Sequence, residues 1–592
     1  MRSSPFIVAI LIVFITLCCG AFSWMEGTIA VELGHSWWYN ALRHGAFASI
    51  IVLAAFIAFR RAFAGFVLGV SMRLRAIRLG EHSDMHIPRE AFFKPLMREI
   101  VYLIRSLDKA RKSAEEEAKL RQESSSLWTE ERLKEFVRQK LGGKTLLMVS
   151  NREPYLHVDR GQGIECIMPA SGVITAVEPV MKACGGTWVA HGAGNMDRET
   201  VDTHDRVRVP PVEPAYSLRR VWLTKEEENG YYYGFSNEGL WPLCHIAHTR
   251  PVFREADFNV YRQVNEKFAA AILEECKDDP KPLIFIQDYH FALLPRMIKK
   301  AKPGAKIALF WHIPWPNPEA FGICPWQRYL VYGMLGCDLI GFHIQFHCNN
   351  FMETVERSIE SRIDWERFTV IHQNHSTVVK PFPISIPFKP SGTDLSIFAS
   401  AKERVAKELG MRPGYLGVGV DRLDYTKGII ERFHAVERFL EKNPRYVGDF
   451  TFVQIGAPSR EHIDRYKRFI ETVGYEAQRI NDKFRNDRCK AIVFLKGYHS
   501  HQEIEPYYQA ADFCLVTSLH DGMNLVAKEY INSRWDDDGA LILSQFAGAS
   551  RELASALLVN PYDIEQVADA IRYCLEMDDE ERARVGTIYK QV

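Results

Sequence analysis

The sequence lacks an excess of charge of either sign. Among its 592 residues, 74 lysines and arginines balance 74 aspartates and glutamates, so the formal net charge is zero. A neutral chain does not produce the broad positive field that attracts nucleic acids, and we therefore expect no nucleic-acid partner. With 47% hydrophobic and 25% charged residues, the composition is that of a globular protein.

The sequence also lacks any C-x-x-C pair, although it contains 12 cysteines. Scattered single cysteines argue against a disulfide framework and against a zinc site, and indicate reduced, buried thiols in a cytosolic body. No long internal repeat and no low-complexity tract is present. A chain of 592 residues is too long for one compact domain, so we expect several.

Two long apolar runs, residues 5–24 and 46–59, stand near the N-terminus. The first is about long enough to span a bilayer, and arginines follow the second, which predicts two transmembrane helices with both outer ends in the cytosol. Residues 1–80 would then anchor the protein in an inner or plasma membrane, with the domains that follow on the cytoplasmic side. The alternatives are a cleaved signal peptide for the first run and a buried or interfacial helix for the second.

The next region, residues 81–143, is charged and mostly helix-forming, and we interpret it as a cytosolic connector. A role in sensing a partner and a plain solvated spacer are both open. From residue 144 onward, short apolar runs alternate with helical stretches, which predicts an α/β fold with parallel sheets. A proline- and glycine-containing stretch near 384–394 divides this part into two predicted domains, 144–388 and 389–592. Ligands of such sheets bind beyond the carboxyl ends of the strands, so the residues after each strand are the candidates for a site.

In the second domain, the run LGVGV is followed by DRLDYTKG, which places Arg422 and Lys427 between a strand end and a helix start. Two fixed cations beside helix-end amides are suited to binding a diphosphate. An equally weighted alternative is that both cations form ion pairs with Asp421 and Asp424.

A second strand end in this domain, after FCLVTSL, reads HDGMNLVAKE. Gly522 permits a close backbone approach, and the amides of residues 523–525 would open a helix towards a phosphate or sugar. Asp521 could accept hydrogen bonds from sugar hydroxyls, and Glu529 could hold a ribose diol. The alternative is a helix-capping aspartate and an exposed helical glutamate.

Three strand ends of the first domain also carry polar groups. TLLMVS leads to Arg152, LIFIQ leads to Asp288, and KIALFW leads to His312 before a proline-stiffened loop. A lone histidine is more often structural. Polar groups at the strand ends of both halves nevertheless favour a cleft between two domains.

Seven motifs in this order, SNR, YYYGFSNEGLWP, QDYH, HIPWPNPE, DRLDYTKG, GAPSR and DGMNLVAKE, resemble the trehalose-6-phosphate synthase family of retaining glycosyltransferases from residue 144 onward. The resemblance implies a GT-B fold, with two Rossmann-like domains facing a cleft. It implies a nucleotide-glucose donor, usually UDP-glucose, glucose 6-phosphate as the acceptor, and neither a metal nor another cofactor. The donor nucleobase and the oligomeric state, a homo-oligomer included, stay open.

The resemblance also assigns roles to residues of this sequence. Its implied catalytic residues are Asp288, His312, Arg422, Lys427 and Asp521. Its implied donor-binding residues are Gly172, Arg422, Lys427, Asp521, Gly522, Met523, Asn524, Leu525, Val526 and Glu529. Its implied acceptor-binding residues are Arg152, Tyr232, Trp241, Asp288 and Arg460. The implied mechanism retains configuration without a protein nucleophile, because the departing diphosphate assists deprotonation of the incoming hydroxyl. A double displacement would instead need Asp288 or Asp521 as the nucleophile.

Two departures from the family pattern leave alternatives open. The family commonly has a second aromatic residue after Trp188, and in this sequence His191 or a neighbouring residue replaces it. That position is expected towards the acceptor, so a glucosylglycerol-phosphate synthase that uses glycerol 3-phosphate is one alternative. A catalytically silent sugar-phosphate-binding regulator is another, although the cleft residues are all present. Members of the family usually continue with a further helix beyond the point at which this sequence ends, so a truncated piece of a longer protein is one interpretation.

Overall fold

A computed structural model of the chain describes residues 130–142, 144–161, 163–169, 172–386, 394–536, 538–578 and 581–582, with isolated positions between 20 and 60. The chain divides into two compact units, residues 1–127 and 128–592. Apart from those isolated positions, the predicted membrane spans lie outside the described residues, as does most of the predicted connector. Across the described positions, no helix is long and apolar enough to cross a membrane.

The N lobe, residues 130–386, is built on a ten-stranded sheet with the order β10-β11-β12-β9-β8-β7-β1-β4-β6-β5. Its centre is parallel, and antiparallel pairs occur only at its two edges among the described strands. The strands in sheet order are Arg362–Asp364, Thr369–His372, His375–Pro381, Leu339–Phe342, Lys306–Phe310, Leu283–Gln287, Leu146–Arg152, Thr187–His191, Tyr216–Val221 and Arg206–Val209. A separate hairpin pairs β2 (Leu156–Asp159) with β3 (Ile164–Ile167).

Helices cover the N-lobe sheet, and one segment departs from α-helical geometry. The main helices are α5 (Gly172–Cys184), α8 (Glu255–Glu275), α9 (Leu294–Ala301), α11 (Gln327–Met334) and α12 (Gln345–Ser358). Helix α6 (Lys225–Glu228) continues into a π-helix, Asn229–Leu240, and then into α7 (Trp241–His245). Wide turns of this kind often mark functional sites, and this one carries Tyr232.

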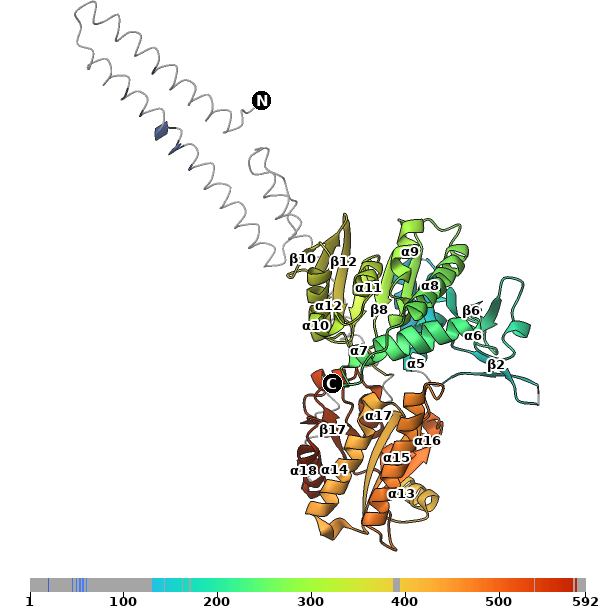
Figure 1. The fold of residues 1–592 in the computed structure, drawn as a ribbon, viewed down its shortest axis with the longest axis vertical. Coiled ribbons are helices and arrows are strands. Elements are labelled where there is room, and N and C mark those ends of the chain that lie inside the picture. Colours follow the sequence, from blue (N-terminus) through green and yellow to red (C-terminus); the bar gives the residue numbers. More distant parts are fainter. Residues whose placement is uncertain are drawn as a thin grey trace, which may run out of the picture. The chain divides into compact units, whose positions relative to one another are not determined.

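The C lobe, residues 394–582, contains a six-stranded parallel sheet with the order β15-β14-β13-β16-β17-β18. The strands in sheet order are Ile492–Lys496, Phe450–Ala457, Tyr415–Arg422, Phe513–Val516, Ala540–Ser544 and Leu557–Val559. The helices are α13 (Ser396–Leu409), α14 (Ile429–Lys442), α15 (Asp464–Lys483), α16 (His501–Ala510), α17 (Leu525–Ser533) and α18 (Ile564–Glu576). Figure 1 shows each sheet as a separate layer with helices packed on its faces.

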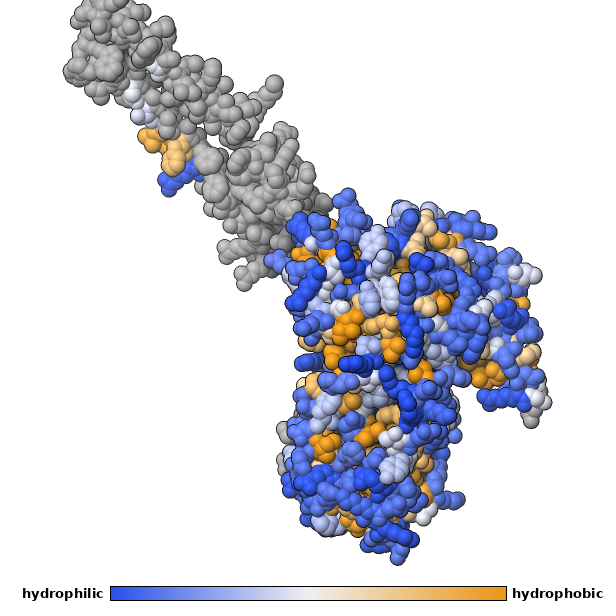
Figure 2. Space-filling model, in the orientation of Figure 1, coloured by the Kyte–Doolittle hydropathy of each residue, from blue (hydrophilic) through white to orange (hydrophobic). Residues whose placement is uncertain are grey.

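The C-lobe strands bury both of their faces. Leu541 and Cys514 belong to one apolar cluster, while their neighbours Ile542 and Leu515 belong to another on the opposite face. Strands buried on both faces have continuous apolar sequences because each face packs against a layer of helices. Burial on both faces explains why the strand in FCLVTS has an almost continuous apolar sequence. On the outside of the molecule, hydrophilic residues dominate the face shown in Figure 2.

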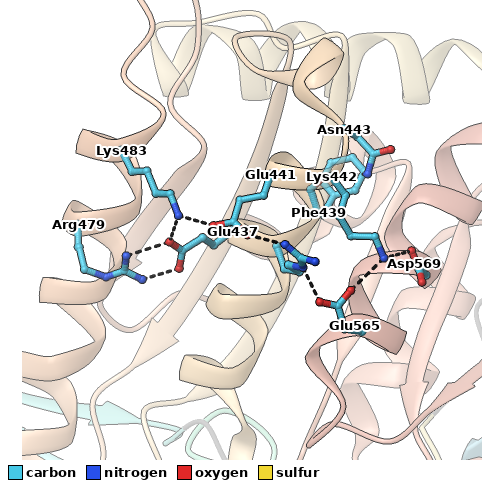
Figure 3. Close-up of polar contacts among 10 residues, drawn as sticks. Glu437, Phe439, Glu441, Lys442, Asn443, Arg479, Lys483, Glu565 and Asp569 are labelled. Carbon is cyan, nitrogen blue, oxygen red and sulfur yellow. Dashed lines mark hydrogen bonds and ion pairs between the residues drawn. The ribbon is translucent and has the colours of Figure 1, made fainter.

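The outer helices of the C lobe are joined by a chain of ion pairs, drawn in Figure 3. On α14, Glu437 accepts from Arg479 at 2.5 Å and Lys483 at 2.7 Å, both on α15. At the C-terminal end of α14, Lys442 binds Glu565 at 3.0 Å and Asp569 at 2.6 Å on α18. A network of this size stabilises the packing of three helices more than an isolated surface pair would.

Eight apolar runs predict the sheets, namely TLLMVS, LIFIQ, KIALFW, LGVGV, FTFVQIG, AIVFLKG, FCLVTS and ALILSQ. All eight are strands: β1, β7, β8, β13, β14, β15, β16 and β17. The strands of the first sheet all precede the predicted boundary at residue 388, and those of the second all follow it. Of the predicted helical connector, the structure describes only α4 (Glu130–Leu141) and the residues that end it, and α4 packs against α5.

Candidate active site

A cleft of about 640 Å³ lies between the N and C lobes and is lined by residues of both. Every predicted site residue except Gly522 lines it. These residues are Arg152, Gly172, Tyr232, Trp241, Asp288, His312, Arg422, Lys427, Arg460, Asp521, Met523, Asn524, Leu525, Val526 and Glu529. The rule that ligands bind beyond the carboxyl ends of strands, called here the strand-end rule, therefore selected side chains that are hundreds of residues apart in the sequence and that line one cleft.

Gly522 does not line the cleft, because it packs against residues of the N lobe. A Cβ atom at Gly522 would overlap the carbonyl oxygen of His312 and lie 3.0 Å from Cδ2 of His343, both in the N lobe. The carbonyl oxygen of Gly522 in turn packs against Gly548. The absent side chain thus allows the backbones of the two lobes to touch.

Asp521 and Lys427 form an ion pair on the C-lobe side of the cleft. Lys427 Nζ lies 2.5 Å from Asp521 Oδ2, which also accepts from Ser518 Oγ at 3.2 Å and Asn524 Nδ2 at 3.1 Å. Burial would raise the pKa of Asp521, but Lys427 outweighs burial and lowers it to about 2. Helix α17 is not capped by the Asp521 side chain, because its N-cap position is Asn524, so the capping alternative is wrong.

The alternative of ion pairs within DRLDYTKG is also wrong. Asp421 binds Arg432 at 2.7 Å, and Asp424 binds Arg460 at 3.0 Å. The guanidinium carbon of Arg422 instead lies 5.3 Å from the centre of the Trp241 ring. Within the described chain, Arg422 has no carboxylate within ion-pair distance, so its charge faces the cleft.

Glu529 is half-buried on the second turn of α17, not exposed as the alternative interpretation had it. The hydroxyl of Tyr508 donates to Glu529 Oε2 at 3.3 Å. Burial raises the pKa of Glu529, and nearby His501 opposes that rise. A carboxylate held in this way is suited to accepting hydrogen bonds from a diol.

A second cationic site surrounds Tyr232. The guanidinium carbon of Arg460 lies 3.9 Å from the centre of the Trp241 ring, and Arg460 Nη1 binds Asp424 Oδ2 at 3.0 Å. Burial would raise the pKa of Tyr232, but the charges of Arg460 and Arg152 lower it to about 8. Arg152 and Tyr232 belong to the N lobe and Arg460 to the C lobe, so this site needs both lobes.

Asp288 and His312 are joined at the carboxyl ends of β7 and β8. Asp288 Oδ1 accepts from the backbone N–H of His312 at 3.1 Å. Burial raises the pKa of Asp288 to about 7. Hydrogen bonds from the backbone N–H groups of Tyr289 and His312, and the positive charges of nearby arginines, lower the pKa but do not cancel the effect of burial. Burial also lowers the pKa of His312 to about 3, so its ring is neutral. His312 Nε2 lies 2.8 Å from Gln287 Oε1, an acceptor, so Nε2 carries the proton and Nδ1 is bare.

Three residues of the cleft have a positive φ, a left-handed backbone conformation that is unfavourable for residues other than glycine. Asp288 has φ 74° and ψ 172°, Asn524 has φ 77° and ψ 93°, and Arg460 has φ 53°. Such conformations cost about 1–3 kcal/mol each and persist where the surrounding structure enforces them. Their presence on three separate loops around one cleft supports a functional role for that cleft.

Several histidines that line the cleft were not among the predicted site residues, although His290 belongs to the strand-end motif QDYH. The His245 ring packs against Trp241 with ring centres 4.0 Å apart, and burial lowers the pKa of His245 to about 3. His290 stacks on Tyr232, and both of its ring nitrogens lack a partner within the described protein. His499 and His501 follow β15, so the strand-end rule applied to AIVFLKGYHSH would have found them.

The residue that departs from the family pattern lies away from the cleft wall. His191 ends β4 and is not among the described residues that line the cleft, and burial lowers its pKa. Trp188 is fully buried and donates to Ser150 Oγ at 2.8 Å. Among the residues that the structure describes, no group of three or more histidine, cysteine, aspartate or glutamate side chains could hold a metal ion.

Comparison with known proteins agrees with this geometry. A family model described as glycosyltransferase family 20 matches residues 144–592, and the chain belongs to this family. The trehalose-6-phosphate synthase of Mycolicibacterium vanbaalenii is 35% identical over 463 residues, covering 76% of this chain and 93% of that protein. A UDP-forming alpha,alpha-trehalose-phosphate synthase of Pichia angusta is 34% identical over 427 residues, covering 70% and 87%. A bifunctional trehalose-6-phosphate synthase/phosphatase of Thermoproteus tenax is 35% identical over 455 residues, and this chain spans only 60% of its length.

Solved structures share the fold. An alpha,alpha-trehalose-phosphate synthase from Burkholderia xenovorans in complex with glucose-6-phosphate superposes with a TM-score of 0.64 at 28% identity, covering 75% of this chain and 94% of the other. A structure described as trehalose-6-phosphate from E. coli bound with UDP-2-fluoro glucose gives a TM-score of 0.65 at 28% identity, with the same coverage. The protein is thus a glycosyltransferase with an α/β, GT-B-like fold.

Proposed function

We propose that the protein transfers glucose from UDP-glucose to glucose 6-phosphate with retention of configuration, giving α,α-trehalose 6-phosphate. The observation that carries the proposal is the presence of two cationic sites in one cleft. One contains Arg422 and Lys427, and the other contains Arg152 and Arg460 beside Tyr232. A reaction between a nucleotide sugar and a sugar phosphate requires two such anion sites at a short separation.

On the donor side, Arg422 and Lys427 bind the diphosphate, and the backbone amides at the start of α17 contribute further N–H groups. Asp521 holds hydroxyls of the donor glucose, and Glu529 holds the ribose. Lys427 must then exchange its present partner, Asp521, for a phosphate oxygen. The Pichia angusta relative, which is named as UDP-forming, supports the choice of uridine.

On the acceptor side, Arg152 and Arg460 bind the 6-phosphate, with the hydroxyl of Tyr232 between them. The Trp241 ring packs against the two arginines of the C lobe, Arg422 and Arg460, and helps to hold them at the cleft. Because His191 lies off the cleft wall, its departure from the family pattern does not alter the surface offered to the acceptor. This favours glucose 6-phosphate over glycerol 3-phosphate.

The proposed mechanism is positioning with electrostatic stabilisation. Arg422 and Lys427 stabilise the negative charge that develops on the departing diphosphate, so no metal is required at this step. Asp288, held by two backbone N–H groups, faces the sugar carbon with a fixed carboxyl group. The departing phosphate oxygen takes the proton of the incoming hydroxyl on the same face, which retains configuration.

A matrix of donors and acceptors tests the proposal. UDP-, ADP- and GDP-glucose are each combined with glucose 6-phosphate or glycerol 3-phosphate, and nucleotide release and product mass are measured. Trehalose 6-phosphate from UDP-glucose is the expected product. Product only with glycerol 3-phosphate would replace the acceptor assignment, and nucleotide-sugar binding without turnover would replace the enzyme by a regulatory protein.

The sequence further leads us to propose an anchor in residues 1–80 that holds the catalytic lobes on the cytoplasmic side of an inner or plasma membrane. Two apolar runs with trailing arginines support this. Carbonate extraction of membranes from cells that express the full chain tests it. Retention in the pellet is expected, and release into the supernatant would contradict the anchor.

A further inference from the structure

The two lobes share a feature that the proposed reaction does not yet use. Each contains an arginine side chain with no exposure to solvent, Arg220 in the N lobe and Arg432 in the C lobe. Each of these arginines binds an acidic side chain, Glu153 or Asp421. That acidic residue is in both cases the immediate chain neighbour of an arginine that lines the cleft.

In the C lobe, Arg432 extends from α14 beneath the carboxyl ends of three strands. Its guanidinium group binds Asp421 Oδ2 at 2.7 Å on β13, Gln454 Oε1 at 2.7 Å on β14, and Thr517 Oγ1 at 2.9 Å after β16. It also donates to the carbonyl oxygen of Lys427 at 3.4 Å. Arg432 thus contacts both segments that carry the donor-site cations.

Glycine at position 419 makes the path for this side chain. A Cβ atom there would lie 2.5 Å from Arg432 Nη1 and 2.8 Å from Gln454 Oε1. The second glycine of LGVGV therefore has a local reason, because any side chain would displace the guanidinium group from beneath the strand.

In the N lobe, Arg220 has the same relationship to the end of β1. It donates to Glu153 Oε2 at 2.8 Å and binds Asp197 Oδ1 at 2.7 Å. It also donates to the carbonyl oxygen of Tyr155 at 3.1 Å. The other oxygen of Glu153 accepts the backbone N–H of Ala193 at 2.8 Å, so the segment after β1 is fixed to the loop after β4.

The position of these acidic residues determines what they control. Arg152 and Arg422 are the last residues of β1 and β13, and Glu153 and Asp421 are their immediate chain neighbours. Fixing Glu153 to Arg220 therefore holds the backbone at Arg152, and fixing Asp421 to Arg432 holds the backbone at Arg422. Both arginines line the cleft.

We propose that Arg220 and Arg432 are positioning residues with separate duties: Arg220 sets Arg152 for the acceptor, and Arg432 sets Arg422 and Lys427 for the donor. This inference rests on the proposed function, since it assigns each arginine to one of the two substrates. Arginine suits the task because its rigid fork binds several acceptors at fixed angles, which a lysine ammonium cannot do. A merely structural role would instead affect both substrates alike.

The test uses the full chain and replaces each arginine by lysine, which keeps the charge and loses the fork. Calorimetry measures the Kd of UDP, and then the Kd of glucose 6-phosphate with UDP at saturation. We expect Arg432→Lys to weaken UDP binding roughly tenfold and to leave glucose 6-phosphate within about twofold. Arg220→Lys is expected to do the reverse.

Arg219→Lys is the matched control. Arg219 precedes Arg220 on β6 but pairs with Asp205 and Glu274 at the edge of the lobe, at 2.5 and 3.1 Å. It should change neither Kd. If an arginine variant fails to fold by circular dichroism, Glu153→Ala and Asp421→Ala, which remove the partner of each arginine, are judged by the same crossed pattern.

The outcomes distinguish a failure of the positioning roles from a failure of the proposed function. Wild-type protein that binds both ligands, with variants that weaken both equally or neither, overturns the positioning roles and leaves the proposed function standing. An equal effect of Arg219→Lys overturns them too. Wild-type protein that binds neither ligand overturns the proposed function and the inference with it.

Discussion

Lys427 Nζ and Asp521 Oδ2 are 2.5 Å apart, and their two side chains come from strand ends 94 positions apart in the chain. Each neutralises the other on the wall of the cleft. The ion pair also lowers the pKa of Asp521 to about 2, against the effect of burial, so the carboxylate remains charged throughout the physiological range. Donor binding must therefore compete with an existing contact.

The first prediction follows from that competition. Asp521→Asn removes the charge that holds Lys427, so the lysine becomes available to a diphosphate. We expect the Kd of UDP alone to fall about tenfold, or ~1.4 kcal/mol, while glucose transfer falls because a sugar ligand is lost. Calorimetry and product formation measure the two effects. Ser518→Ala removes a hydroxyl bonded to the same oxygen and keeps the ion pair, so it should leave UDP affinity unchanged. Weaker UDP binding by Asp521→Asn would contradict the proposal that Lys427 leaves Asp521 for a phosphate oxygen of the donor.

The second prediction concerns the pH dependence of acceptor binding. Burial opposes ionisation of Tyr232, but Arg460 and Arg152 lower its pKa to about 8, so a phenolate forms as pH rises through that value. A phenolate repels the phosphoryl dianion. The Kd of glucose 6-phosphate should therefore rise between pH 7.5 and 9. The phosphate itself stays dianionic across this range, because its second pKa is about 6. Tyr232→Phe should flatten the profile. Parallel slopes for both proteins would show that another group is responsible.

The third prediction concerns the contact between the lobes at Gly522. A Cβ atom at this position would overlap the carbonyl oxygen of His312, so Gly522→Ala must separate the lobes. A shift of this kind at a reacting centre lowers kcat/KM by roughly 100-fold. Gly474→Ala, in α15 with no atom within 4 Å of the added methyl group, is the control. It should retain activity and gain about 0.5–1 kcal/mol of stability. Full activity of Gly522→Ala would mean that the lobes need not touch there during turnover.

The fourth prediction concerns stability against pH through Glu153. Burial and the hydrogen bond with Asp197 raise the pKa of Glu153 to about 8 in spite of Arg220. The folded protein thus keeps a proton that the unfolded chain releases near pH 4, so this contribution is complete at low pH. It declines as pH rises and is lost once pH passes about 8. Glu153→Gln cannot titrate, so the difference in Tm between wild type and variant should change in favour of the variant from pH 5 to 8. A constant difference would mean that Glu153 is ionised in the fold.

The sequence sufficed for the sheets and for the cleft cations because both follow local rules. Arg422 and Arg152 stand directly after apolar runs, and parallel strands present their carboxyl ends at one edge. Arg432 could not be found in this way. It stands in an amphipathic helix as one polar residue among several, and its burial depends on Gln454 and Thr517, which are distant in sequence. The π-helix that carries Tyr232 had no periodic signal either, since its sequence, NGYYYGFSNEGL, fits neither a strand nor an amphipathic helix.

The left-handed conformations of Asp288, Asn524 and Arg460 link the shape of the cleft to the stability of the fold. Asp288, with φ 74° and ψ 172°, occupies a region that is nearly reserved for glycine. Asp288→Gly would relieve that strain but would leave the backbone N–H groups of Tyr289 and His312 without their acceptor. Arg460→Gly would likewise leave the buried Asp424 carboxylate without its ion-pair partner. The contacts that hold these strained conformations are thus the same contacts that shape the cleft. A search for stabilised variants that remain active should hold these three positions fixed.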